Sequence, residues 1–232
     1  MNTQQHRSTV SPFPYGWCSS DLGKYRFCYG TYDLYAYDSL PPIATSQLQE
    51  NLQWLMPLHT DLDRIMQTYQ PMTWEQKRSR EKLHKIIDSA QQLGLSLPTA
   101  FLRLMSSPAL QDRIPSCTAC YFELSENIIP CPGDKEGYLI RFLNDQQGCL
   151  CWYLYLTPQK EPSILVSSYW LDDTDENEYE GNHSERLKNT YICSPSFEAF
   201  IYRFWLENTI WFNLHSHNPL TREQQQYLEY YQ

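Results

Sequence analysis

Cysteine and histidine residues give this sequence its most visible candidates for metal chemistry. Cys117 and Cys120 have the spacing of a zinc knuckle. Further ligands to a tetrahedral site could come from Cys131, His215 and His217. No second Cys-x-x-Cys pair follows, however, and a single pair is a weak indication of zinc. A thioredoxin-like role is also disfavoured, because the pair precedes a strand and does not open a helix. We therefore predict free thiols, no bound metal and no cofactor.

Motifs of nucleophilic and phosphate chemistry are not found in the sequence. It has no Gly-x-Ser-x-Gly elbow and no His-Glu-x-x-His pair, and its 8 glycines form no phosphate-binding loop. The 6 histidines are scattered, and His84 is expected to be partly buried on a helix. The sequence therefore predicts a protein that is not an enzyme. Two alternatives stay open: an enzyme whose site is built from scattered His and acidic residues, and a structural module stabilised by a metal ion.

An acidic run is the strongest candidate for a binding surface. Its carboxylates lack the glycine that a calcium-binding loop requires, so calcium is not favoured. One interpretation is a solvated loop. The other is a surface whose charge steers a basic protein partner and whose aromatic side chains anchor it. The candidate protein-binding residues are Tyr169, Trp170, Asp172, Asp173, Asp175, Glu176 and Tyr179.

The charge balance of the 232 residues argues against several function classes. Lys and Arg number 18 and Asp and Glu number 27, which gives a net charge of −9. A binder of nucleic acid or of anionic membranes needs clustered Lys and Arg, so neither partner is expected. With 41% hydrophobic and 15% aromatic residues, the chain has enough material for a packed core. No apolar run approaches the roughly 20 residues of a membrane span.

The N-terminal sequence shows no apolar stretch of the kind found in signal peptides. We therefore expect a cytoplasmic, reducing location, where a free cysteine behaves as a small buried hydrophobic residue. Cys149 and Cys151 are accordingly expected to be core thiols within an apolar strand.

The sequence predicts three parts. Residues 1–11 are polar and are expected to form a disordered tail. Residues 12–72 form a Tyr-rich N-terminal extension that docks on the rest, and residues 73–232 form the main domain.

Local structure is also predicted within the extension. Strands are expected at 25–29 and 32–36, joined by a turn at Gly30-Thr31. Residues 46–70 have helical spacing of leucines, interrupted at Pro57.

A helix with clear boundaries is predicted to begin at residue 73. Thr73 and Gln76 form a capping box at its start, and Gly94 suits a left-handed stop at its end. Basic residues between 77 and 85, Lys82 among them, are assigned to its solvated side. A short helix follows Pro98.

Beyond Pro115 the hydrophobic period changes from helical to alternating. Short turns separate the expected strands, so an antiparallel meander is the simplest topology. The strands are expected at 120–124, 138–143, 149–156, 163–170 and 190–193. A helix capped at Ser194 or Ser196 then presents an aromatic stripe to the strand 149–156, and Thr221 caps a last helix. The stripe consists of Phe197, Phe200, Ile201, Phe204 and Trp205.

The order of these features resembles the SUKH superfamily. The resemblance covers residues 73–212, and residues 1–72 lie outside it. The motifs that carry it are Gln92-Leu93-Gly94, Leu97-Pro98-Thr99-Ala100-Phe101, Phe142-Leu143-Asn144-Asp145-Gln146-Gln147, Trp152-Tyr153-Leu154, and a closing helix from Ser196-Phe197 that carries Phe200.

The resemblance implies an α+β fold, with a mostly antiparallel sheet flanked by helices. The superfamily includes fungal cell-wall-synthesis regulators and bacterial immunity proteins, which are understood as non-catalytic scaffolds that bind other proteins. It therefore implies a protein partner, such as a basic toxin domain that the chain neutralises. The family has no universal functional residues, so no site residue is carried over.

Overall fold

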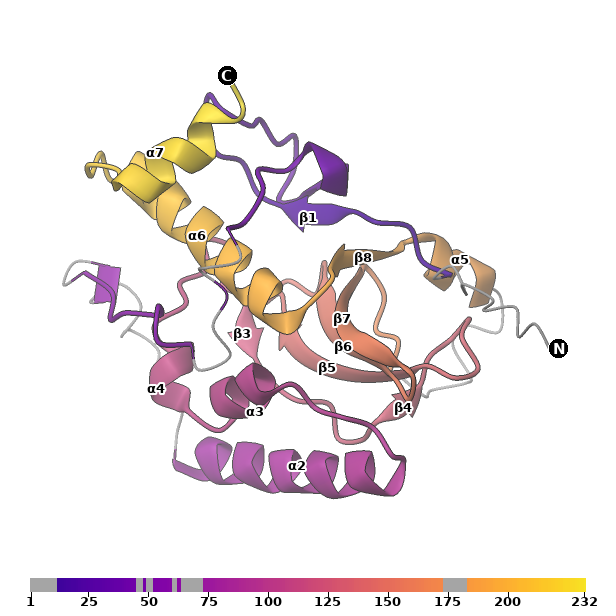
Figure 1. The fold of residues 1–232 in the computed structure, drawn as a ribbon. Coiled ribbons are helices and arrows are strands. Elements are labelled where there is room, and N and C mark those ends of the chain that lie inside the picture. The colour runs from indigo at the N-terminus through magenta and orange to yellow at the C-terminus, as the bar shows by residue number, and fades with distance from the viewer. Residues whose placement is uncertain (1–11, 45–47, 49–51, 60–61, 64–72, 173–182) are drawn as a thin grey trace, which may run out of the picture.

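The computed structural model describes residues 12–44, 48, 52–59, 62–63, 73–172 and 183–232, and gives only the backbone of 73–77 and 183–185. Within these residues a six-stranded antiparallel sheet forms the centre of the molecule (Figure 1). The strands run in the order β3-β5-β6-β7-β8, and β4 also pairs with β5. This arrangement confirms the α+β class and the antiparallel meander. The strands are β3 (Tyr121–Phe122), β4 (Ile129–Pro130), β5 (Tyr138–Asn144), β6 (Cys151–Thr157), β7 (Lys160–Ser167) and β8 (Thr190–Ser194).

The central strand β6 is covered on both faces, as its continuous apolar sequence predicts. On one face Trp152 and Leu154 belong to the largest hydrophobic cluster, which also contains helical residues. On the other face Tyr153 and Tyr155 belong to a second cluster. Cys151 is buried as expected, but the prediction for Cys149 is wrong, because this residue is exposed. The strand begins only at Cys151, and the backbone N–H of Cys149 is held in the preceding turn by the Asp145 carboxylate at 3.1 Å.

Helices surround the sheet (Figure 1). The first of them, α2, ends as predicted, because Gly94 adopts a φ of +67° and the N–H of Leu95 reaches the carbonyl of Ala90 at 2.9 Å. The side chains of the expected capping box at Thr73 lie outside the described residues. The helices are α2 (Thr73–Gln92), α3 (Thr99–Met105), α4 (Pro108–Gln111), α5 (His183–Lys188), α6 (Phe197–His215) and α7 (Arg222–Glu229), with a 3₁₀ turn, η1, at Tyr37–Ser39.

Two side chains of α2 differ from the prediction. Lys82 is buried. Its ammonium forms ion pairs with the carboxylates of Glu123, at 3.1 Å, and Glu126, at 3.0 Å, both in the segment that follows β3. His84 is exposed instead of partly buried, since it lies on the face of the helix opposite Leu83 and Ile86.

The aromatic stripe of α6 is confirmed at the four buried residues Phe197, Phe200, Ile201 and Phe204, whereas Trp205 is only partly buried and packs on Trp54. The hydroxyl of Ser196 caps the helix by accepting the N–H of Ala199. Phe200 and Phe204 pack on Trp152 of β6, with ring centroids 6.3 and 6.1 Å apart. At the end of the chain Thr221 caps α7 in a complete capping box, as predicted.

The predicted hairpin in the N-terminal part is half wrong. Its second strand is present as β2 (Asp33–Tyr35), but the partner is β1 (Trp17–Ser19) and not residues 25–29. The reason is long-range, since Arg26 points its guanidinium into the protein toward a carboxylate 181 residues away. The two strands form a separate two-stranded sheet.

The predicted helical segment 46–70 is wrong at residues 52–59, whereas Leu62 and Asp63, beyond the interruption at Pro57, are helical as predicted. Residues 52–59 form a turn and extended chain, and Leu52 has a φ of +52°. Leu52 and Leu55 are buried in the main cluster, so tertiary packing overrides their helical spacing. Most of the remaining positions of this segment, and the predicted tail at 1–11, lie outside the described residues.

Candidate functional site

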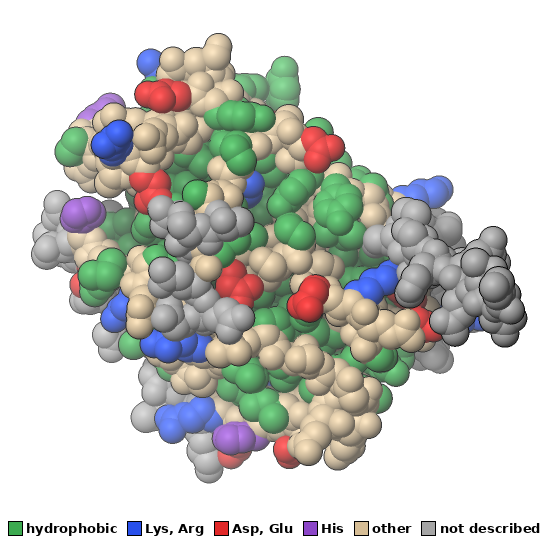
Figure 2. All heavy atoms as spheres, viewed as in Figure 1, with side chains coloured by type: hydrophobic (Ala, Val, Ile, Leu, Met, Phe, Trp, Pro, Cys, Tyr) green, Lys and Arg blue, Asp and Glu red, His purple; other side chains and the backbone are tan. Residues whose placement is uncertain are grey.

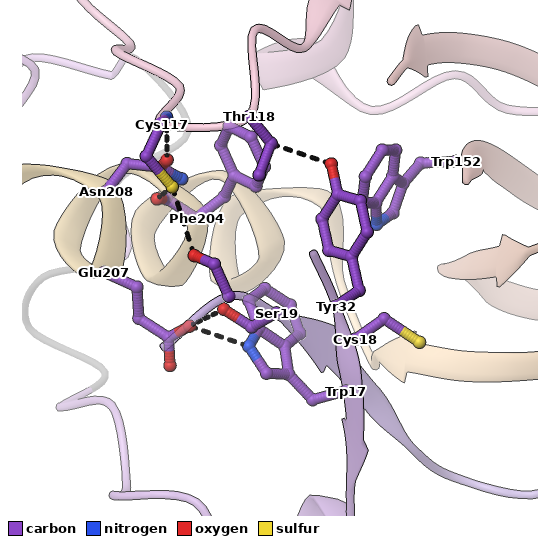
Figure 3. A pocket seen from close by; sticks show the side chains of 11 residues that line it. Trp17, Cys18, Ser19, Tyr32, Cys117, Thr118, Trp152, Phe204, Glu207 and Asn208 are labelled. Carbon is purple, nitrogen blue, oxygen red and sulfur yellow. Dashed lines mark hydrogen bonds between the residues drawn. The ribbon is translucent and has the colours of Figure 1, made fainter. Parts of the chain in front are cut away.

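A buried carboxylate, Glu207 of α6, lies at the centre of a sealed polar network (Figure 3). Its Oε2 accepts hydrogen bonds from the indole N–H of Trp17 at 2.9 Å and from the hydroxyl of Ser19 at 2.6 Å. Arg26 donates to both oxygens, at 2.6 and 2.8 Å. The hydroxyl of Tyr227 donates to Oε1 at 2.6 Å. The network therefore fastens β1 and the loop after it to α6 and α7.

The electrostatics of this network fix its charge state. Burial alone would raise the pKa of Glu207, but the charge and hydrogen bonds of Arg26, helped by Arg203, outweigh it and lower the pKa to about 2. A carboxylate with that pKa and five hydrogen bonds stays ionised near neutral pH and has no proton to exchange. Glu207 therefore has a structural role and is no general acid or base.

A second buried carboxylate, Asp145, joins β2 to the main sheet. It accepts a hydrogen bond from the hydroxyl of Tyr32 at 2.7 Å, and that hydroxyl also lies 2.7 Å from Oγ1 of Thr118. The other oxygen of Asp145 accepts the backbone N–H groups of Gln147 and Cys149. Like Glu207, this carboxylate is occupied by partners within the chain.

Cys117, the first residue of the Cys-x-x-Cys pair, borders a very small cavity that Glu207 also lines (Figure 3). The cavity has a volume of about 10 Å³, enough for a single water molecule. The backbone N–H of Cys117 donates to Asn208 at 2.8 Å, and its Sγ lies 3.1 Å from the hydroxyl of Ser20. Burial raises the pKa of the Cys117 thiol to about 11, which disfavours the thiolate that a nucleophile or zinc ligand needs. In the described part of the chain no three His, Cys, Asp or Glu side chains converge as metal ligands.

Of the residues predicted to bind a protein, the structure describes three, Tyr169, Trp170 and Asp172. Both oxygens of Asp172 accept the Nε–H of Arg141, at 3.0 and 2.9 Å. Trp170 is 39% exposed and covers the same guanidinium at 4.3 Å. The charge of Asp172 is thus compensated within the molecule, while Tyr169 packs at the edge of the second hydrophobic cluster. The other four, Asp173, Asp175, Glu176 and Tyr179, lie outside the described residues.

The larger cavity is a groove between the two sheets, which we call the inter-sheet groove. Its volume is about 210 Å³. Cys18 and Leu34 are directly paired across β1 and β2, so their side chains share the face of the small sheet that borders the groove. Val166 and Tyr191, paired across β7 and β8, border it from the main sheet. The complete lining is Cys18, Tyr32, Asp33, Leu34, Leu150, Val166, Ser168, Asn189 and Tyr191.

Exposed hydrophobic side chains lie on the segment 27–35, of which residues 32–34 line this groove. Phe27 is 66% exposed, Tyr29 is 90% exposed and Leu34 is 49% exposed. These are three of the nine large hydrophobic side chains that are exposed among the described residues. The segment is held in place by hydrogen bonds from the N–H of Tyr29 to Asp33 and from the hydroxyl of Tyr35 to the Phe27 carbonyl, both 2.9 Å. On the face drawn in Figure 2, hydrophobic side chains gather over the β1 region.

The sequence did not identify these residues as a candidate site, although it contained a signal. The alternation of Tyr25, Phe27 and Tyr29 predicts that they share one face of a strand at 25–29, but the structure has no strand there, and Phe27 and Tyr29 are exposed to solvent. Glu207 and Arg203 also had a signal, because they occupy the aromatic face of α6 together with Phe200 and Phe204. Charged residues on an otherwise apolar helix face indicate a buried ionic network.

Comparison with known proteins gives no match: no family description, no curated protein and no solved structure matches this chain. No helix in the part of the chain that the structure describes is long and apolar enough to cross a membrane.

Proposed function

We propose that this chain is a non-catalytic protein-binding domain in the cytoplasm, which neutralises a toxin or another bacterial protein in the manner of an immunity protein. The observation that carries the proposal is the segment 27–35, where Phe27, Tyr29 and Leu34 are exposed and where residues 32–34 line the inter-sheet groove. Exposed aromatic side chains next to a concave surface are typical of the anchoring part of a protein interface.

Two further features support binding over catalysis. The carboxylates of Glu207, Asp145 and Asp172 each accept hydrogen bonds from donors of the same chain, so they stabilise the fold. The net charge of −9 favours a basic protein partner and disfavours nucleic acid.

The test is a binding experiment with a matched pair of double variants. Proteins captured from the native host by the immobilised chain are identified, purified and measured against it by calorimetry. Phe27→Ser combined with Tyr29→Ser should weaken the reconstituted complex by at least about tenfold, which is the effect of losing one interface hot spot. Neither residue is buried, so the fold is retained.

The control removes two exposed aromatic side chains elsewhere. Tyr121 and Tyr230 are 41% and 52% exposed, and Tyr121→Ser combined with Tyr230→Ser should leave the affinity unchanged. Failure to reconstitute a complex with any captured protein would contradict the proposed function. Equal weakening by the two double variants would exclude segment 27–35 as its site.

A further inference from the structure

We propose that the inter-sheet groove is the docking site for one neutral aromatic side chain, a Trp or Tyr, presented by a basic protein partner. This inference rests on the proposed function and names the group that the partner contributes. It follows from the size of the groove, from its charge and from the chemistry of its walls.

The size of the groove selects a single side chain. Its volume of about 210 Å³ lies below the roughly 300–1,000 Å³ of sites that hold drug-sized molecules. It also lies far above the volume of about 10 Å³ of the one-water cavity beside Glu207. One large side chain fits such a space, and Trp, Tyr and Arg are the residues that most often anchor interfaces.

The charge of the groove distinguishes among these three. Asp33 is the one charged residue among the nine that line it. The register places Asp33 opposite Ser19, on the face of the small sheet that looks toward Glu207, whereas Leu34 faces the groove. The Asp33 carboxylate accepts the N–H of Tyr29 in the neighbouring loop. The one carboxylate that lines the groove is therefore already hydrogen-bonded within the chain, and burying a guanidinium there would be costly.

The walls match an aromatic ring with a polar edge. Tyr32 and Tyr191 offer ring surfaces, and Tyr32 already packs edge-on against Trp152 at 6.2 Å. Leu150 and Val166 are buried and form an aliphatic floor. At the rim, Ser168 is exposed and offers a hydroxyl and a carbonyl that can accept the indole N–H of a Trp or the hydroxyl of a Tyr.

The charge outside the groove complements this neutral interior. A chain with a net charge of −9 attracts a basic partner over distances at which the groove itself plays no part. The aromatic side chain then supplies the anchor in the groove. Charge sets the rate of association, and the groove sets the rate of dissociation.

The experiment uses N-acetyl-L-tryptophanamide, a neutral molecule, as the probe. Methyl resonances of leucine and valine in the labelled full-length chain are followed by NMR during its titration. The probe should shift the methyl signals of Leu34, Leu150 and Val166, with weak but saturable binding. N-acetyl-L-argininamide should bind at least about tenfold more weakly, because its guanidinium would have to be desolvated.

Leu34→Ala removes one wall of the groove and should weaken probe binding about fivefold, as expected for half a leucine side chain of contact. Leu34 is 49% exposed, so the variant retains its fold. Leu93→Ala is the matched control, since Leu93 is 39% exposed near the end of α2 and does not line the groove. Ser168→Trp, which puts an indole at the rim, should abolish the groove shifts.

Three results would overturn the inference. The first is the absence of shifts at the groove methyl groups, and the second is stronger shifts with the arginine probe. The third is a dimer at low concentration that dissociates when Leu34 is replaced, because a second copy would then occupy the groove.

If the probe binds as expected but no partner can be reconstituted, the proposed function fails and the groove assignment stands. If a partner binds equally well to the Leu34→Ala variant, the docking inference fails and the proposed function stands.

Discussion

The two faces of the small β1–β2 sheet differ in the charge of the side chains around them. On one face, Trp17 and Ser19 donate hydrogen bonds to Glu207, and Arg26 completes a network without exposed charge. On the other face, Cys18 and Leu34 border an open, neutral groove. The charged face is closed by its own partners, so it holds the chain together. The neutral face leaves room for a partner, since filling it requires no charge to be removed from water.

Both faces depend on the same two strands. If the Glu207 network is lost, β1 loses its attachment to α6, and the groove loses one of its walls. Stability and binding are therefore coupled in one direction. Changes at Glu207 should affect both properties, whereas changes in the groove should affect binding alone.

The largest effect is expected from Glu207→Gln. The substitution keeps the size of the side chain but leaves the guanidinium of Arg26 buried without its counter-charge. Breaking a buried ion pair in this way costs about 3–5 kcal/mol of unfolding free energy. Urea denaturation followed by circular dichroism measures it.

The control for this variant is an exposed ion pair. Arg78 and Glu126 lie 2.9 Å apart, with side chains that are 58% and 55% exposed. Arg78→Gln should leave the urea midpoint almost unchanged, because water screens an exposed ion pair. Similar losses in the two variants would show that the Glu207 network is not the main attachment of β1.

The next effect is a pH dependence that belongs to the same network. Glu207 has its pKa lowered from 4.5 to about 2 on folding, so its contribution is fully present above pH 4.5. It is lost as the pH falls from 4.5 toward 2, because the unfolded chain then binds a proton that the folded chain does not. A shift of this size corresponds to about 3 kcal/mol.

The measurement is the urea midpoint of the wild-type chain and of the Glu207→Gln variant between pH 7 and 2.5. The difference between the two should shrink below pH 4.5, since the variant has no carboxyl to protonate at this position. A difference that stays constant with pH would mean that another group controls acid unfolding.

These networks also explain how far the sequence alone could predict the molecule. Helices α2, α6 and α7 and strands β5 to β8 were predicted because their caps and hydrophobic periods are local properties. The strand at 25–29 was wrong because Arg26 bonds to a residue 181 positions away. No local pattern encodes that contact.

The candidate site shows the same limit. Trp170 and Asp172 were selected from an acidic run, yet Asp172 is bound to Arg141. The groove is formed by residues of the small sheet, β7, β8 and the loops next to them, and only the fold brings these together. A sequence pattern that considers one segment at a time cannot predict a site that lies between two sheets.

A smaller effect is expected from Asp172→Asn. It removes the charge that pairs with Arg141, but the amide oxygen still accepts one hydrogen bond. Trp170 continues to cover the guanidinium. The expected loss is about 1–3 kcal/mol, the cost of weakening a hydrogen bond to a charged group. Thermal unfolding of the variant measures the loss.

This variant also tests the earlier assignment of the acidic run to partner binding. If Asp172 served only to steer a partner, its replacement would slow association without changing stability. A decrease in stability with an unchanged association rate would assign Asp172 to the fold.

The smallest effect is expected at Gly16, on the edge of the groove. A Cβ added there would lie 2.7 Å from the Cδ1 of Leu34, so one of the two groups must move. Leu34 is half exposed, so its side chain can rotate about χ1 and χ2 and move Cδ1 away, and the hydrogen bond from the Gly16 N–H to the Ile192 carbonyl does not involve the side chain. Gly16→Ala should therefore cost less than about 1 kcal/mol, because the reduced freedom of the unfolded chain offsets part of the strain.

Gly137→Ala is the matched comparison, because its Cβ would lie 2.6 Å from the ring of Tyr155 and 2.9 Å from the Cβ of Cys131, in the second hydrophobic cluster. That variant should lose about 1–3 kcal/mol, the usual cost of overpacking a core. Equal losses in the two variants would show that the groove wall is as rigid as the core, and a rigid wall could not adapt to an incoming aromatic ring.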